Sequence, residues 1–95
     1  MFVILLKFSD NKANAGAFMD GHNAWIKAGF DDEVFLLVGS IKPGMGGAII
    51  AHNVALEDLE TRVKEDPFVQ EGGVTAEFIE IDPARTDERL AFLKQ

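Results

Sequence analysis

No cysteine occurs among the 95 residues, so the chain has neither a disulfide framework nor thiolate chemistry. Basic residues are also scarce, because nine Lys and Arg stand against sixteen Asp and Glu and give a formal net charge of −7. A chain this acidic is not attracted to phosphate backbones or anionic membrane surfaces. We therefore expect neither nucleic acid nor a membrane as a partner.

Long hydrophobic runs are absent as well. The apolar start of the chain, residues 1–8, is too short for a membrane span and lacks the basic region and cleavage site of a signal peptide. The glycine-rich stretch 42–47 matches neither GxGxxG nor GxxxxGK[ST], and no HExxH or Cys-rich zinc pattern occurs. The expectation is a cytoplasmic protein without a cofactor or a metal.

What the sequence does contain is apolar material for a core, with 47% hydrophobic residues and eight Phe. This composition is typical of a packed globule rather than a disordered acidic chain. A chain of this length forms one domain, residues 1–95, and buries only somewhat more than ~60% of its unfolded surface. Such a modest core favours oligomerisation.

The hydrophobic pattern predicts four strands separated by two helices. The strands are expected at 2–8, 34–40, 48–52 and 74–82, with the second and third joined as an antiparallel hairpin. The first helix is expected from about Ala13 to a Gly29 C-cap, and Asn53 is a candidate N-cap for the second. The order βαββαβ predicts an α+β, ferredoxin-like fold with a four-stranded antiparallel sheet.

Helical spacing places His22 on the inward face of the first helix. At about 100° per residue, the side chains within about 60° of it are apolar or small; they are Ala15, Phe18, Met19, Trp25, Ile26 and Gly29. Asp20, Asn23 and Lys27 fall on the solvated face. A histidine in this position is either a core residue bonded to a carbonyl or a functional one.

An acid, Asp66, lies on the inward side of the second helix. Continuing the helical wheel puts it about 20° from Leu59 and about 60° from Val63. Because Pro67 disfavours helical geometry in the preceding residue, the chain should leave the helix at Asp66 and present the carboxylate from a turn.

These two residues are the candidate catalytic pair. Both predicted helices cover the same sheet face, so Asp66 can orient one nitrogen of His22 and leave the other facing a cavity, as in an oriented general base. The alternative for Asp66 is a turn acid held by backbone amides. His52, which ends the third strand, has no inward acid near it and is expected at the surface.

Further residues are candidates for binding a substrate. Ser40 offers a hydroxyl at the mouth of the hairpin, although no GxSxG motif surrounds it. Phe68 and Trp25, together with Phe18 and Met45, are candidates for the wall of an aromatic pocket, and core packing accounts for the helical ones equally well.

The chain resembles the YCII-related proteins of the dimeric α+β barrel superfamily. The resemblance covers nearly the whole chain and rests on His22, on the 35–40 strand with its glycine-rich hairpin, and most specifically on Glu65-Asp66-Pro67-Phe68-Val69 followed by Glu71-Gly72. Many relatives carry a larger residue where this chain has Gly21. In that family the histidine and the aspartate before proline form a catalytic dyad, so the resemblance implies this role for His22 and Asp66.

The resemblance also implies a function class. A characterised member of the family is a dehydrochlorinase, a lyase that acts on a chlorinated hydroxyquinol in aromatic degradation, and most other members have no assigned function. We therefore expect acid–base chemistry on a small hydroxylated aromatic, with a non-catalytic ligand-binding dimer or a cofactor-free oxygenase as alternatives. A homodimer is expected through the open sheet face, with a helix capped by Asp82 and begun by Pro83 packing on the partner from the tail, residues 83–95.

Overall fold

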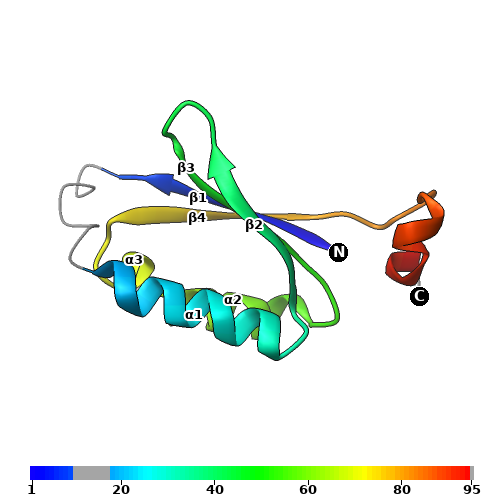
Figure 1. Cartoon of the computed structure of the whole chain (residues 1–95), viewed down its shortest axis with the longest axis horizontal. Coiled ribbons are helices and arrows are strands. Elements are labelled where there is room, and N and C mark those ends of the chain that lie inside the picture. Colours follow the sequence, from blue (N-terminus) through cyan, green and yellow to red (C-terminus); the bar gives the residue numbers. More distant parts are fainter. Residues whose placement is uncertain (10–17, 95) are drawn as a thin grey trace.

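The computed structural model describes residues 1–9 and 18–94. Strands and short helices alternate along these residues (Figure 1). In chain order they are β1 (Phe2–Phe8), α1 (Met19–Asp31), β2 (Phe35–Ile41), β3 (Gly46–Ala51), α2 (Leu56–Lys64), α3 (Pro67–Gln70), β4 (Val74–Glu80) and the 3₁₀ helix η2 (Glu88–Lys94). The ends of the predicted strands move by up to two residues.

The four strands form one sheet in the order β2-β3-β1-β4, and every neighbouring pair is antiparallel. Helices α1, α2 and α3 all lie against the same face of this sheet (Figure 1). The predicted α+β, ferredoxin-like fold is thereby confirmed, and so is the antiparallel β2–β3 hairpin. None of the described helices is long and apolar enough to cross a membrane.

The core lies between the sheet and the helices. Alternate residues of β1 point toward the helices and are buried, namely Phe2, Ile4 and Leu6. Ile49 pairs directly with Ile4, and Leu59 and Val63 of α2 complete the layer with less than 2% of their surface exposed. This period-2 burial against a helical stripe fixes which face of each element is turned inward.

Helix α1 departs from the prediction at its C-terminal end. The residues before Phe18 in the predicted helix, 13–17, lie outside the described part of the chain. Gly29 is not the C-cap: it lies buried inside the helix, which continues to Asp31 with Asp32 as its cap. A Cβ on Gly29 would lie 2.1 Å from a ring carbon of Phe35, so this glycine permits close packing of α1 on β2.

Two further cap predictions were wrong. Asn53 has φ 59° in the loop after β3, and Ala55 precedes α2 without a side-chain hydrogen bond. Asp82 and Pro83 start no helix; the tail becomes helical only at Glu88, where the Asp87 carboxylate accepts from the backbone N–H of Arg89. Short polar side chains favour caps and turns alike, so such signals do not distinguish between the two.

Candidate active site

The chain leaves α2 where the sequence predicts. Asp66 has φ −64° and ψ 125°, which is extended rather than helical, and it caps the short helix α3 that begins with Pro67. Proline suits the first position of a helix because its missing N–H has no partner there in any case. The resulting corner between α2 and α3 turns the Asp66 carboxylate into the core, where none of its surface is exposed.

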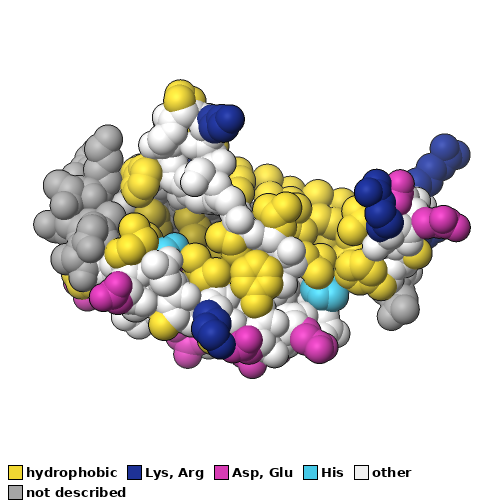
Figure 2. Space-filling model, in the orientation of Figure 1, with side chains coloured by type: hydrophobic (Ala, Val, Ile, Leu, Met, Phe, Trp, Pro, Cys, Tyr) yellow, Lys and Arg dark blue, Asp and Glu magenta, His cyan; other side chains and the backbone are white. Residues whose placement is uncertain are grey.

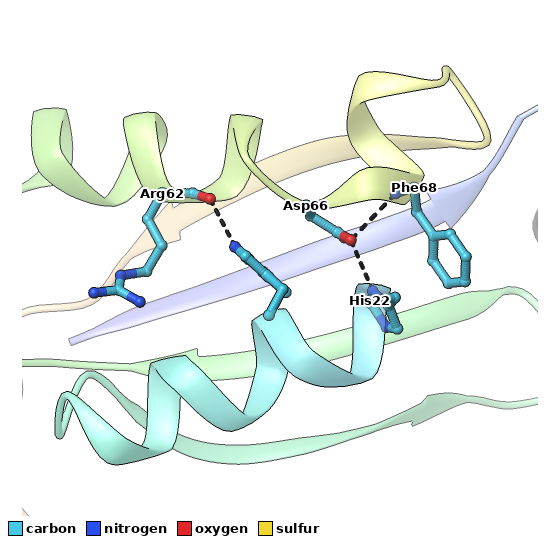
Figure 3. A network of polar contacts seen from close by, with 5 residues as sticks. His22, Arg62, Asp66 and Phe68 are labelled. Carbon is cyan, nitrogen blue, oxygen red and sulfur yellow. Dashed lines mark hydrogen bonds and ion pairs between the residues drawn. The ribbon is translucent and has the colours of Figure 1, made fainter. Parts of the chain in front are cut away.

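The structure brings His22 and Asp66 into contact. His22 Nδ1 lies 2.8 Å from Oδ1 of Asp66, and the two side chains come from α1 and from the corner before α3 (Figure 3). A carboxylate oxygen accepts hydrogen bonds, so Nδ1 carries the hydrogen and Nε2 is left as the other ring nitrogen. The His22 side chain is 15% exposed, whereas that of Asp66 is fully buried.

A backbone amide holds the same carboxylate oxygen. The N–H of Phe68 donates to Oδ1 of Asp66 over 3.2 Å (Figure 3). The two roles considered for Asp66, a turn acid and a partner of His22, therefore occur together in one oxygen atom. The second oxygen, Oδ2, is buried and has no hydrogen-bond partner among the described residues.

The imidazole of His22 also stacks with two aromatic rings. The ring of Phe68 stacks on it with centroids 4.1 Å apart and planes 18° apart. The indole of Trp25 stacks at 6.0 Å and 24°. These flat contacts, together with the hydrogen bond to Asp66, restrict rotation of the imidazole about its side-chain bonds.

Helix α1 is tied to α2 by polar contacts at Arg62. The indole N–H of Trp25 donates to the backbone carbonyl of Arg62 over 2.8 Å, and the Arg62 guanidinium lies 2.6 Å from the carboxylate of Asp32. The labelled Arg62 lies on α2, one turn before Asp66 (Figure 3). These contacts fix the helix that carries His22 relative to the corner that carries Asp66.

A cavity of about 270 Å³ opens beside His22, between α1 and the sheet. Most of its wall is apolar, with Leu6, Ile26, Val38, Ile49 and Phe68 among the lining residues. Among the described residues, the polar side chains on the wall are those of His22, Asn23 and Ser40. The arrangement provides a mainly apolar slot with a fixed imidazole on one wall, as acid–base chemistry on a small molecule requires.

The predicted binding residues divide into two groups. Ser40 and Phe68 line the cavity. Trp25 does not line the cavity formed by the described residues, because its buried ring packs on His22 and Phe35 instead. Phe18 and Met45 are not on the cavity wall either.

Sequence reasoning assigned Asn23 to the solvated face, but this exposed residue lies at the cavity wall. Helical spacing carried a signal for this, since Asn23 lies four residues after Met19 and three before Ile26, and both of these also line the cavity. His52 lines a different hollow beside the C-terminal segment, where its ring meets that of Phe92. The described residues contain no group of three or more His, Asp or Glu that would suit a metal ion.

Comparison with known proteins shows a likeness in fold and none in sequence. No family model matches the chain, and no curated protein matches it in sequence. Among solved structures, the fold is similar to that of 5-chloro-2-hydroxyhydroquinone dehydrochlorinase (TftG) from Burkholderia phenoliruptrix AC1100, in complex with 2,5-dihydroxybenzoquinone. The TM-score is 0.71 at 15% sequence identity, over 84% of this chain and 91% of that one. At this identity the likeness establishes the shared fold.

Proposed function

We propose that this protein is a small cofactor-free enzyme in which His22, oriented by Asp66, moves protons on a hydroxylated aromatic ring. The observation that carries the proposal is the 2.8 Å contact between His22 Nδ1 and Asp66 Oδ1 on a side chain that also lines a cavity. An imidazole held in this way has one nitrogen engaged and the other available to a ligand.

The most concrete reaction is dehydrochlorination of a chlorohydroxyquinol to a hydroxyquinone. His22 Nε2 removes the proton of a ring hydroxyl and returns it to the carbon that bears chlorine, which gives a keto tautomer. Loss of a second hydroxyl proton then expels chloride and forms the quinone. One proton and one chloride leave the substrate, and no external oxidant or reductant is consumed, so the chain's own residues suffice.

Asp66 supports the proton transfers made by His22 without touching the substrate. Its hydrogen bond fixes which nitrogen of His22 carries the hydrogen, and its negative charge stabilises the imidazolium that forms when Nε2 takes a proton. The apolar wall strengthens this electrostatic interaction by limiting access of water. The shared fold with a dehydrochlorinase adds support for this class of reaction.

Replacing His22 by Asn tests the proposal. We expect chloride release from a chlorohydroxyquinol to fall by roughly 10²-fold or more, because the acid–base group is lost. Chloride is measured under anaerobic conditions, and circular dichroism establishes that the variant is folded. A folded His22→Asn protein with unchanged turnover would overturn the assignment.

The second candidate function is non-catalytic binding of a small molecule by a dimer. The observation that favours it is that the rings of Phe68 and Trp25 both stack with the imidazole, as expected for a structural histidine. Under this alternative a ligand binds, no product forms, and no rate shows an ionisation that depends on Asp66.

A further inference from the structure

We propose that the cavity beside His22 selects uncharged single-ring molecules and rejects rings that carry a carboxylate, sulfonate or phosphate. This inference rests on the proposed function and narrows its substrate class. It is carried by the size of the cavity, the chemistry of its wall and the charge of the chain.

The size of the cavity fits one substituted ring. An apolar protein cavity of roughly 150 Å³ holds benzene, whereas sites for drug-sized ligands begin at roughly 300 Å³. The cavity measures about 270 Å³, so it has room for a ring with several small substituents. A nucleotide or a two-ring ligand would protrude into solvent.

The described part of the cavity wall carries no charged side chain other than an imidazole. No Lys, Arg, Asp or Glu of residues 1–9 and 18–94 lines it. Against this described part of the wall, an anionic substituent would lose its hydration without gaining a counter-charge, which is strongly unfavourable. His22 does not provide the missing cation, because any positive charge on its ring is already paired with Asp66 at 2.8 Å.

The charge of the whole chain acts in the same direction. A net charge of −7 lowers the local concentration of anions near the surface and slows their approach. The barrier to an anionic ring therefore arises both on approach and inside the cavity. Neutral molecules encounter neither of these two barriers.

Hydroxyl groups, by contrast, have partners on two walls. Asn23 offers an amide donor and acceptor from α1, and Ser40 offers a hydroxyl from β2. Neither side chain makes a hydrogen bond with another described residue. A ring with two or more hydroxyls can therefore be held between the helix and the sheet with His22 beside one of them.

A matched pair of ligands isolates charge from shape. We expect 3,5-dihydroxybenzamide to bind at least about tenfold more tightly than 3,5-dihydroxybenzoate, since the two differ mainly in the charge of one substituent. Affinity is measured by NMR titration of backbone amides, with the shifts mapped to the cavity. Equal or tighter binding of the benzoate, or binding of neither compound at the cavity, would overturn the inference.

A new cation in the cavity should reverse the preference. Ser40→Lys places an ammonium group at the mouth of the slot, and the benzoate should then bind at least as tightly as the benzamide. Thr61→Lys is the matched control, because it makes the same change in net charge at an exposed position on α2. Reversal in both variants would show a general charge effect and contradict selection by the cavity wall.

These measurements separate the inference from the proposed function. Selective binding of the benzamide without turnover of any hydroxyquinol would support selection by charge in the cavity and contradict the enzymatic role. Turnover of a chlorohydroxyquinol with equal binding of the two matched ligands would support the enzymatic role and contradict selection by charge in the cavity.

Discussion

At the scale of single residues, the imidazole of His22 contacts three side chains that restrict its orientation. Asp66 accepts a hydrogen bond from its Nδ1, and the rings of Phe68 and Trp25 both stack with the imidazole. Asp66 itself is fully buried, and its Oδ2 lacks a partner among the described residues. Burying such an oxygen lowers the free energy of unfolding, because its lost hydration is not replaced by a hydrogen bond. Stability alone therefore does not explain this aspartate, whereas orientation of His22 does.

Two substitutions at Asp66 should have unequal effects on turnover. In Asp66→Asn the side-chain oxygen keeps its place, because the N–H of Phe68 must still meet an acceptor there. His22 Nδ1 can then still donate to that oxygen, and only the negative charge is lost. We expect a loss in kcat of roughly 10- to 10²-fold for Asp66→Asn and a loss close to that of His22→Asn for Asp66→Ala.

The measurement is kcat for each folded variant and for the original protein. Equal kcat values for Asp66→Asn, Asp66→Ala and the original protein would refute a positioning role for Asp66.

The sequence predicts the His22 and Asp66 contact because both positions are set by strong local rules. Helical periodicity turns His22 inward, and proline at position 67 forces the chain to turn at Asp66. Asn23 was assigned to the solvated face but lies at the cavity wall. Trp25 is turned inward as the spacing predicts, and of the two roles left open for it, core packing and pocket wall, the structure shows core packing. Helical periodicity places a residue on a face of the helix, but it does not show which part of that face borders the core and which part borders a cavity.

At the scale of elements, the contact between α1 and α3 sets the approach of His22 to Asp66. Gly21 precedes His22, Pro67 follows Asp66, and a Cβ built on Gly21 would lie 3.0 Å from Cγ of Pro67. This distance is shorter than ordinary van der Waals contact. The absence of a side chain at position 21 therefore lets the two elements approach closely enough for the 2.8 Å contact next to them.

Substitutions at Gly21 should therefore separate stability from function. Gly21→Ala raises helix propensity by up to about 1 kcal/mol, yet its Cβ presses on Pro67. We expect reduced kcat with unfolding free energy unchanged or raised, and a larger loss of kcat in Gly21→Val. NMR of the His22 ring reports the weakened hydrogen bond to Asp66 without any need for turnover.

A double-mutant cycle with Pro67→Ala provides the control. Removing Cγ of Pro67 removes the atom that the new Cβ meets, so Gly21→Ala should have little effect in that background. Additive effects of the two substitutions would show that the Gly21 and Pro67 contact does not position His22.

The order and type of the elements follow from local pattern, but their ends do not. Gly29 looks like a helix stop, yet close packing against Phe35 requires a glycine inside α1. Asn53 and Asp82 have the chemistry of N-caps, but φ 59° at Asn53 and the extended tail after Asp82 use them in other ways. Such outcomes are decided by tertiary contacts that a single sequence does not reveal.

At the scale of the whole molecule, one face of the sheet carries a row of apolar side chains and is covered by none of the described helices α1, α2 and α3. Strand register aligns Leu37, Ile50, Val3 and Ile79 across all four strands. Leu37 and Ile79 are 51% and 41% exposed. Figure 2 shows apolar side chains gathered between the β2–β3 hairpin and the C-terminal segment, where Leu90 and Phe92 are also exposed.

We propose that this face and the tail, residues 83–94, form the interface of a homodimer. A contiguous apolar surface on a small domain favours association, and pairing of identical faces closes a two-fold dimer. Sedimentation should therefore show a dimer at micromolar concentration, and Leu37→Lys should shift it toward monomer. Thr61→Lys serves as the control, and a monomer for the unchanged protein would refute the interface.

The central claim is that His22 transfers a proton between a ring hydroxyl and a ring carbon. The most direct test is hydrogen–deuterium exchange at the ring carbons of unchlorinated hydroxyquinol in D₂O, followed by NMR under anaerobic conditions. The account predicts that the protein accelerates incorporation of deuterium and that His22→Asn, folded to the same degree, does not. Equal exchange rates with the original protein and with His22→Asn would contradict it.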